Sequence, residues 1–170
     1  MKSNIYYLGL IALGAVARVL PHPPNFTPTG AIAFFGGNKL TNKWAAFLAP
    51  LAILALSDLV IGLHGTLPFV YASFLITVAL GRIMGSSNAG RVLGLGLSSA
   101  IFFIISNFGV WLGSGMYPHT GGGLWSCYLA ALPFFRNELA ANFLYGGAFF
   151  LAAGLIEKNI GVLSRQKQTA

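Results

Sequence analysis

Residues 28–43 of the chain read PTGAIAFFGGNKLTNK, and this stretch decides how many times the polypeptide crosses a membrane. A helix over 28–42 rises about 1.5 Å per residue and so spans only about 22 Å. A hydrocarbon core of about 30 Å requires roughly 20 apolar residues. Gly36 and Gly37 also interrupt the apolar run. This segment is therefore the weakest of the candidate spans.

The composition is that of a membrane protein. Of 170 residues, 56% are hydrophobic and 8% are charged, whereas soluble domains carry about 25% charged residues. We therefore predict an all-α integral membrane protein with one transmembrane domain over residues 1–163 and a flexible cytoplasmic tail over 164–170. Its apolar segments lie at 4–20, 28–42, 44–63, 68–84, 91–113 and 136–157.

The positive charges support counting segment 28–42 as a crossing. With six crossings and both termini in the cytoplasm, the inner side carries Lys2, Lys39, Lys43, Arg82, Arg91, Lys158, Arg165 and Lys167. Only Arg18 and Arg136 then lie outside, as the positive-inside rule requires. The sequence thus predicts a six-helix transmembrane bundle. The net charge of +7 is explained by orientation in a lipid bilayer, and no nucleic-acid partner is predicted.

Segment 113–136 is predicted to lie on the outer side. It begins GSGMYPHTGGG and continues LWSCYLAALPFF, an apolar piece too short to span. Trp125 and Tyr128 suit the headgroup level of a membrane. We expect a long outer loop that carries a short interfacial or re-entrant helix.

Side chains that can take part in ligand binding or catalysis gather on this outer side. The three histidines, His22, His64 and His119, all fall in outer loops, together with Cys127 and Trp125. The inner loops hold only ordinary basic and small polar residues. Any site therefore belongs to the outer half of the bundle.

Polar residues inside the predicted helices occur at one level. Asp58 lies about 9 Å below the outer end of its helix, and Asn107 and Asn142 lie at a similar depth. Helical spacing places Glu138 on the face of Asn142, and Trp111 on the face of Asn107. Ionisable groups in a bilayer usually face a bundle interior or a cavity. These residues predict the floor of an outward-facing pocket.

The proline-rich segment 18–31, RVLPHPPNFTPTGA, is predicted to form a stiff lid over that pocket. Prolines restrict their own φ and the residues before them, so ordering the loop around a ligand would cost little entropy. His22 and Asn25 supply polar groups, and Phe26 supplies an apolar face. The alternative is a tight turn that only joins two helices.

Structural roles for the polar residues stay open at this point. Asp58 could simply pair with Arg18, and Asn107 and Asn142 could form hydrogen bonds between helices. The histidines, Cys127 and Asp58 show no metal-ligand spacing, so no metal site or cofactor is predicted. The sequence has neither a Walker-type phosphate loop nor a GxSxG elbow.

Several stretches resemble a family of small, functionally uncharacterised bacterial membrane proteins: RVLPHPPNFTPTGAIAFFGG, LSDLVIGLHG, YASFLITVALGR, SNFGVWLGSGMYPHTGGGL and CYLAALPFFRNELAANFLYG. That family is in turn similar to the S components of energy-coupling-factor transporters. The resemblance implies six helices with cytoplasmic termini in the inner membrane, and a vitamin or metal ion bound under outer loops one, three and five. It also implies a transmembrane coupling subunit with ATPases, and it keeps cobalamin among the candidate substrates.

The function expected from the sequence is capture of a small molecule in an outward-facing pocket. The expected substrate-binding residues are His22, Asn25, Phe26, Asp58, His64, Asn107, Trp111, His119, Trp125, Glu138 and Asn142. Trp111 and Trp125 are expected to stack on the ligand. One alternative is a non-transport scaffold with a filled bundle. Another, an enzyme, predicts a histidine within about 2.6–3.2 Å of Asp58.

Overall fold

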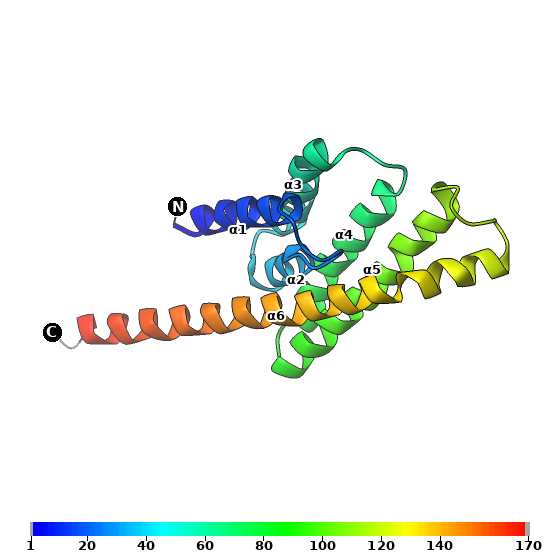
Figure 1. The fold of residues 1–170 in the computed structure, drawn as a ribbon. Coiled ribbons are helices and arrows are strands. Elements are labelled where there is room, and N and C mark those ends of the chain that lie inside the picture. The colour runs from blue at the N-terminus through cyan, green and yellow to red at the C-terminus, as the bar shows by residue number, and fades with distance from the viewer. Residues whose placement is uncertain (1, 169–170) are drawn as a thin grey trace.

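The computed structural model describes residues 2–168, with side chains described for residues 9–158. Within that range all regular structure is helical (Figure 1). The helices are α1 (Lys2–Val19), α2 (Thr29–Lys39), α3 (Lys43–Ile61), α4 (Leu67–Met84), α5 (Asn88–Gly113) and α6 (Gly121–Gln168). The predicted helices are therefore present, and the bounds of the first five differ from the prediction by only a few residues.

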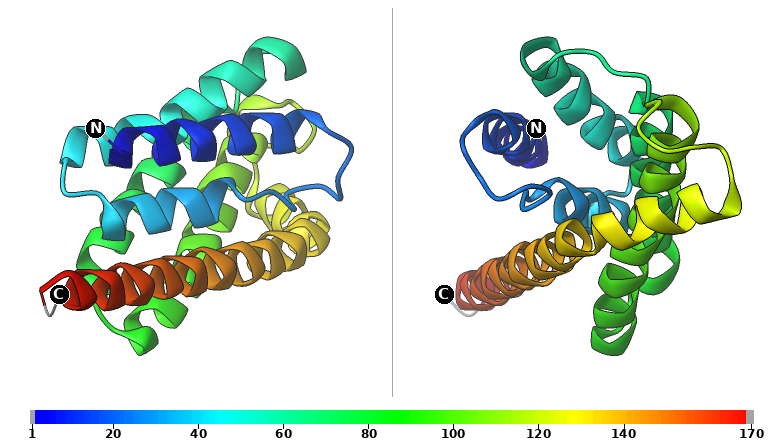
Figure 2. Two further views of the ribbon diagram at one scale, coloured as in Figure 1. Left: turned by 90° about the vertical axis from the view of Figure 1, so that its left-hand side faces the viewer. Right: turned by 45° about the vertical axis from the view of Figure 1, so that its right-hand side comes forward.

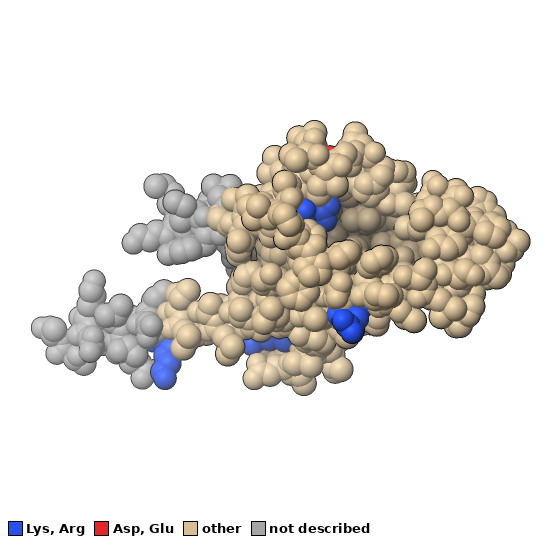
Figure 3. Space-filling view, viewed as in Figure 1, with Lys and Arg blue, Asp and Glu red and all other residues tan. Residues whose placement is uncertain are grey.

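Four helices are long and apolar enough to cross a membrane: α3, α4, α5 and the Gly121–Lys158 part of α6. Figure 3 agrees, since the face it shows has few Lys or Arg side chains and almost no acidic ones. These helices mark the chain as a membrane protein, as predicted. The apolar part described for α1, Gly9–Val19, is shorter, and α2 has only 11 residues.

The connections after α1, α3 and α5 lie together at one end of the molecule. Segments 20–28, 62–66 and 114–120 form this loop end, whereas the first and last helices begin and finish at the opposite, terminus end (Figures 1 and 2). Figure 2 shows α6 running along the bundle from the loop end to beyond the terminus end.

The short helix α2 is the centre of the bundle. It contacts every other helix, and it is buried from Thr29 to Phe34 and again at Gly36 and Gly37. A helix enclosed by protein does not need to match the thickness of a bilayer, since protein contacts replace lipid around it. Enclosure by protein therefore accounts for the short length of α2.

Glycines allow α2 and α4 to cross at close range. A Cβ atom on Gly37 would overlap the carbonyl oxygen of Val78, and one on Gly81 would overlap the carbonyl oxygen of Phe34. Each helix thus presents a glycine to the backbone of the other, which is how small residues let membrane helices approach.

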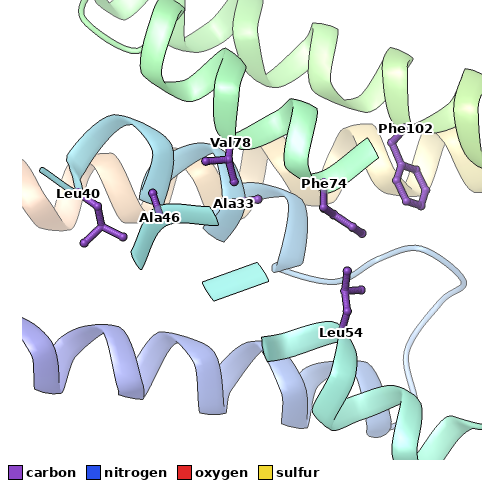
Figure 4. Packing of buried hydrophobic residues seen from close by; sticks show 7 residues of the cluster. All are labelled: Ala33, Leu40, Ala46, Leu54, Phe74, Val78 and Phe102. Carbon is purple, nitrogen blue, oxygen red and sulfur yellow. The ribbon is translucent and has the colours of Figure 1, made fainter. Parts of the chain in front are cut away.

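The apolar core surrounds this crossing. Figure 4 shows its buried side chains, which come from α2, α3, α4 and α5 and from the residue that directly follows α2: Ala33, Leu40, Ala46, Leu54, Phe74, Val78 and Phe102. The rings of Phe74 and Phe102 lie 5.2 Å apart between centroids. The core therefore reaches towards the loop end through these two phenylalanines.

The predicted short helix in a long fifth loop is wrong. The connection covers only 114–120, and the apolar piece 124–135 forms the first turns of α6, which continues through Pro133. These turns pack on α5: Tyr128 donates to the carbonyl of Ile104 at 2.8 Å, and Phe103 lies 4.9 Å from Phe135 between ring centroids. These contacts hold the first turns of α6 against α5.

The predicted tail begins inside the same helix. Because α6 continues to Gln168, residues 164–168 are helical, and residues 169–170 lie outside the described part. The flexibility of this segment and its cytoplasmic location stay predictions.

Candidate ligand-binding site

Two adjacent cavities open at the loop end. The loop-one cavity has a volume of about 320 Å³, and its wall includes Arg18, His22, Asn25, Thr27, Phe74, Phe102 and Glu138. The loop-five cavity, of about 310 Å³, is lined mainly by α5 and α6 with residues of loops one, three and five. Asn25 and Phe102 belong to both walls. Each volume is at the lower end of the range for small-molecule sites.

Loop 20–28 closes over these cavities as an ordered turn. The amide of Phe26 donates to the carbonyl of Pro23 at 2.9 Å, and Asn25 has φ 61°, as residue i+2 of a type II turn has. Asparagine tolerates this left-handed conformation better than most residues. Asn137 of α6 donates to the carbonyl of Pro24 at 3.0 Å. The turn at Pro23–Phe26 and the contact with Asn137 of α6 therefore fix the conformation of this loop.

His22 braces this loop. Its Nδ1 lies 2.8 Å from the carbonyl oxygen of Pro23, and its Nε2 lies 3.2 Å from that of Arg18. Both ring nitrogens thus face backbone oxygens, although the ring itself lines the loop-one cavity. The residue contributes surface and rigidity to the site.

Asp58 forms a buried ion pair. Its Oδ1 accepts from Arg18 Nη2 at 2.8 Å, and its Oδ2 accepts from the hydroxyl of Tyr71 at 3.0 Å. Only 1% of the Asp58 side chain is exposed, against 17% for Arg18. The pairing alternative is therefore confirmed. Arg18 lies between Asp58 and the loop-one cavity, so Asp58 does not line the cavity.

Glu138 and Asn142 form a second polar cluster under the lid. Asn142 Nδ2 donates to Glu138 Oε1 at 3.1 Å and to Ser99 Oγ of α5 at 2.7 Å. Both side chains are buried, and Glu138 lines the loop-one cavity. Asn142 thus makes the hydrogen bond between helices that was one of its two interpretations.

Gly30, near the start of α2, makes room for this cluster. A Cβ atom there would overlap Asn142 Oδ1 and would lie 2.9 Å from Glu138 Oε1. Asn142 Oδ1 is buried without a conventional hydrogen bond, and the Cα hydrogen of Gly30 points towards it, which is a weak polar contact. Gly30 therefore lets the first turn of α2 pack directly against the Glu138–Asn142 pair.

Asn107 lines the loop-five cavity, as predicted for a pocket residue. Its Nδ2 donates to the carbonyl of Phe103 in its own helix at 2.8 Å. Among the described contacts, its side-chain amide therefore forms no hydrogen bond to another helix. Beside it, the Cys127 thiol donates to the Asn107 carbonyl at 3.4 Å. Val70, Val110 and Ala131 give this cavity a largely apolar wall.

Seven predicted site residues lie outside both cavity walls: Asp58 and Asn142, described above, and Phe26, His64, Trp111, His119 and Trp125. Phe26 packs against Tyr145 with centroids 5.9 Å apart, and His64 Nδ1 lies 2.7 Å from the Thr66 hydroxyl. Trp111 donates to the carbonyl of Pro118 and lies edge-on to His119, with ring centroids 5.3 Å apart. Trp125 is 65% exposed on the surface. The structure thus does not bring Trp111 or Trp125 to the cavities, because their indoles serve the loop and the outer surface.

The sequence did not point to the two aromatic rings of the loop-one wall, Phe74 and Phe102. Phenylalanine on an apolar membrane helix looks the same whether it faces lipid, core or cavity. Arg18 was considered only as a partner for Asp58. A signal for Gly30 existed, since a glycine directly follows Thr29 at a helix start, but its close approach to α6 depends on tertiary packing.

The histidines, the cysteine and the acids do not converge. Among the described residues there is no group of three or more such side chains close enough to hold a metal ion. Neither His22 nor His64 forms a hydrogen bond to Asp58 within the described part; their partners are the backbone and Thr66.

A central buried helix, four apolar helices of membrane-spanning length and cavities at one end define a helical-bundle membrane protein. The chain belongs to a family of unknown function, DUF6580, which matches residues 1–165. No curated protein and no solved structure matches the chain.

Proposed function

We propose that this protein captures a small molecule in the two loop-end cavities and holds it beneath loop 20–28. The observation that carries the proposal is the pair of adjoining cavities, which share Asn25 and Phe102 and whose walls combine apolar side chains with a few polar groups. Binding sites for small molecules combine apolar walls with a few fixed polar groups.

The lid and the floor have distinct tasks in this mechanism. The turn at Pro23–Phe26 is already ordered by Asn137, so closing over a ligand needs little further ordering. Arg18 and Glu138 present charge from below. The ligand is held by burial against Phe102 and is oriented by these polar groups.

Transport on the pattern of S components is the wider form of the proposal. It places six crossings and cytoplasmic termini in a bacterial inner membrane, with the loop end outside. Release on the other side then requires reorientation driven by a coupling subunit and ATPases. A vitamin-sized substrate suits the volumes of the two cavities.

The scaffold alternative expects a filled bundle. The Asn142–Ser99 hydrogen bond fits a scaffold and a capture protein equally well. The cavities favour capture, since a helix bundle that only joins other proteins has no use for polar hollows beneath an ordered loop.

Native mass spectrometry of the full chain from lipid nanodiscs tests the proposal. Ala131 is buried in the loop-five wall, and Ala131→Leu is expected to fill space that the ligand uses. Ala148→Leu makes the same change on an exposed face of α6 and serves as the control. We expect a recurring added mass on the natural protein and on Ala148→Leu, and its loss from Ala131→Leu. Folded protein that is bare in every sample would refute capture.

A further inference from the structure

The loop-one cavity contains a carboxylate that the fold leaves without a basic partner. The chain has three acidic residues. Asp58 is paired with Arg18 at 2.8 Å, and Glu157 is paired with Lys39 at 2.7 Å. Glu138 makes no ion pair with any described side chain, although only 4% of it is exposed. A buried carboxylate is expensive unless something compensates for it.

The surroundings of Glu138 hold the carboxylate in place and leave part of it free. Asn142 donates to Oε1, and the second oxygen accepts no hydrogen bond from the described residues. That oxygen is not among the enclosed polar atoms without a partner, so it is reached from the cavity that Glu138 lines. The carboxylate is therefore positioned to accept from a ligand.

Arg18 on the same wall is already paired. Its Nη2 is used by Asp58 and its Nε donates to Ser57 Oγ at 2.7 Å. Because Arg18 and Asp58 balance each other, Glu138 is the acidic group on the described cavity wall that is left to pair with an occupant. The balance favours a positively charged occupant.

Two aromatic rings complete the cavity wall. Phe74 and Phe102 line the loop-one cavity with Glu138, and their ring planes are inclined at 46°. The faces of aromatic rings attract cations, most strongly in a desolvated site. Carboxylate and rings together are the combination that binds an organic cation.

We propose that the captured ligand carries a cationic nitrogen, which binds the Glu138 carboxylate beside the rings of Phe74 and Phe102. This inference rests on the proposed function and specifies its substrate class. An organic cation fits better than a metal ion, since hard metal ions require several oxygen ligands and the described residues form no such group. The remainder of the ligand lies past Phe102, against the apolar wall of the loop-five cavity.

The test compares two probes of the same shape, phenyltrimethylammonium and tert-butylbenzene, which differ in charge. Binding is measured as thermal stabilisation of the full chain in nanodiscs and as displacement of the captured mass. Glu138→Gln keeps an oxygen for Asn142 and removes the charge. Glu157→Gln removes a charge from an exposed side chain at the terminus end and is the matched control.

We expect the natural protein and Glu157→Gln to bind the cationic probe about tenfold more tightly than the neutral one. Glu138→Gln should lose this preference. It should keep a cooperative thermal unfolding transition without ligand, because glutamine retains an oxygen for Asn142, and that transition shows that the variant folds. Equal binding of the cation by Glu138→Gln and the natural protein would overturn the inference, and so would the absence of any preference for charge.

The outcomes separate this inference from the proposed function. A neutral or anionic mass that is retained by Glu138→Gln and lost from Ala131→Leu would refute the cation and leave capture standing. Failure to find either a captured mass or a bound probe would refute both.

Discussion

The bundle has hollows at both of its ends, and they differ in chemistry. A groove of about 500 Å³ lies between α5 and α6 towards the terminus end, and among its described lining residues only Arg91 and Asn88 are polar. The two loop-end cavities are smaller individually, but their walls include Arg18, the buried carboxyl group of Glu138 and the amides of Asn25 and Asn107. Volume alone therefore does not identify a site; convergent polar groups beneath an ordered loop do.

The groove has a plain structural origin. Cβ atoms added to Gly147 and Gly154 would meet nothing within 4 Å, so these glycines leave an open channel along α6. Arg91 closes one end, held by the carbonyl of Gly85 at 2.9 Å and lying 4.6 Å from the centroid of the Phe150 ring. Such an apolar surface on a membrane protein suits lipid chains, whereas the loop-end cavities are the ones that we propose bind a polar ligand.

Breaking the loop-end ion pair should have the largest effect on stability. Arg18→Met leaves Asp58 buried and uncompensated, and we expect a loss of about 3–5 kcal/mol in the free energy of unfolding. Reversible denaturant unfolding in mixed micelles measures it. Lys39→Met breaks the pair at the terminus end, where Glu157 is exposed, and should cause no measurable loss. Recovery in the Arg18→Met, Asp58→Asn double variant would show that the unpaired charge is the cause, and equal losses from the two single variants would contradict it.

A smaller effect is expected where α2 crosses α4. Gly81→Ala drives a methyl group into the backbone of Phe34 and should destabilise the protein by about 1–3 kcal/mol. Gly154→Ala in the open groove is the control, and it should be neutral or should gain up to about 1 kcal/mol from helix propensity. The same denaturant titration compares them. If the two variants behave alike, the crossing is looser than described.

The smallest effect should follow from changing an exposed aromatic residue. Trp125→Leu alters a side chain outside both cavities, and we expect occupancy by the captured mass to stay unchanged in native mass spectra. Phe102→Leu, on the wall common to both cavities, should lower that occupancy. A loss of ligand from Trp125→Leu would restore the stacking role that the sequence suggested.

Much of the fold could be predicted because it depends on local properties. Apolar length and loop composition located the first five helices, and the polar residues Asp58, Asn142 and Glu138 marked the end of the bundle where they cluster. The start of α6 could not be predicted in this way. Pro133 and the glycines at 121–123 are typical of a break, whereas packing of Tyr128 and Phe135 on α5 keeps the helix continuous.

The site was harder to predict than the fold, because its composition depends on which way each side chain points. Asn25, Asn107 and Glu138 line the cavities. In contrast, the indole of Trp111 donates to the carbonyl of Pro118, and Phe26 packs against Tyr145. No pattern along the chain distinguishes Phe74 from the other phenylalanines. Their orientation is set by the glycine crossing of α2 and α4, which only the assembled bundle reveals.

The central position of α2 has a consequence for how the chain is made. A helix of 11 residues is too short to settle across a bilayer unaided, and two of the helices that enclose it, α4 and α6, are translated later. The early α1–α3 stretch must therefore stay rearrangeable during membrane insertion until α6 has been synthesised. A ribosome that stops before Glu138 and Asn142 would leave α2 without the side chains that cover Gly30. Quality-control proteases would then meet an exposed, incompletely enclosed segment, so truncated chains should be degraded rather than accumulate.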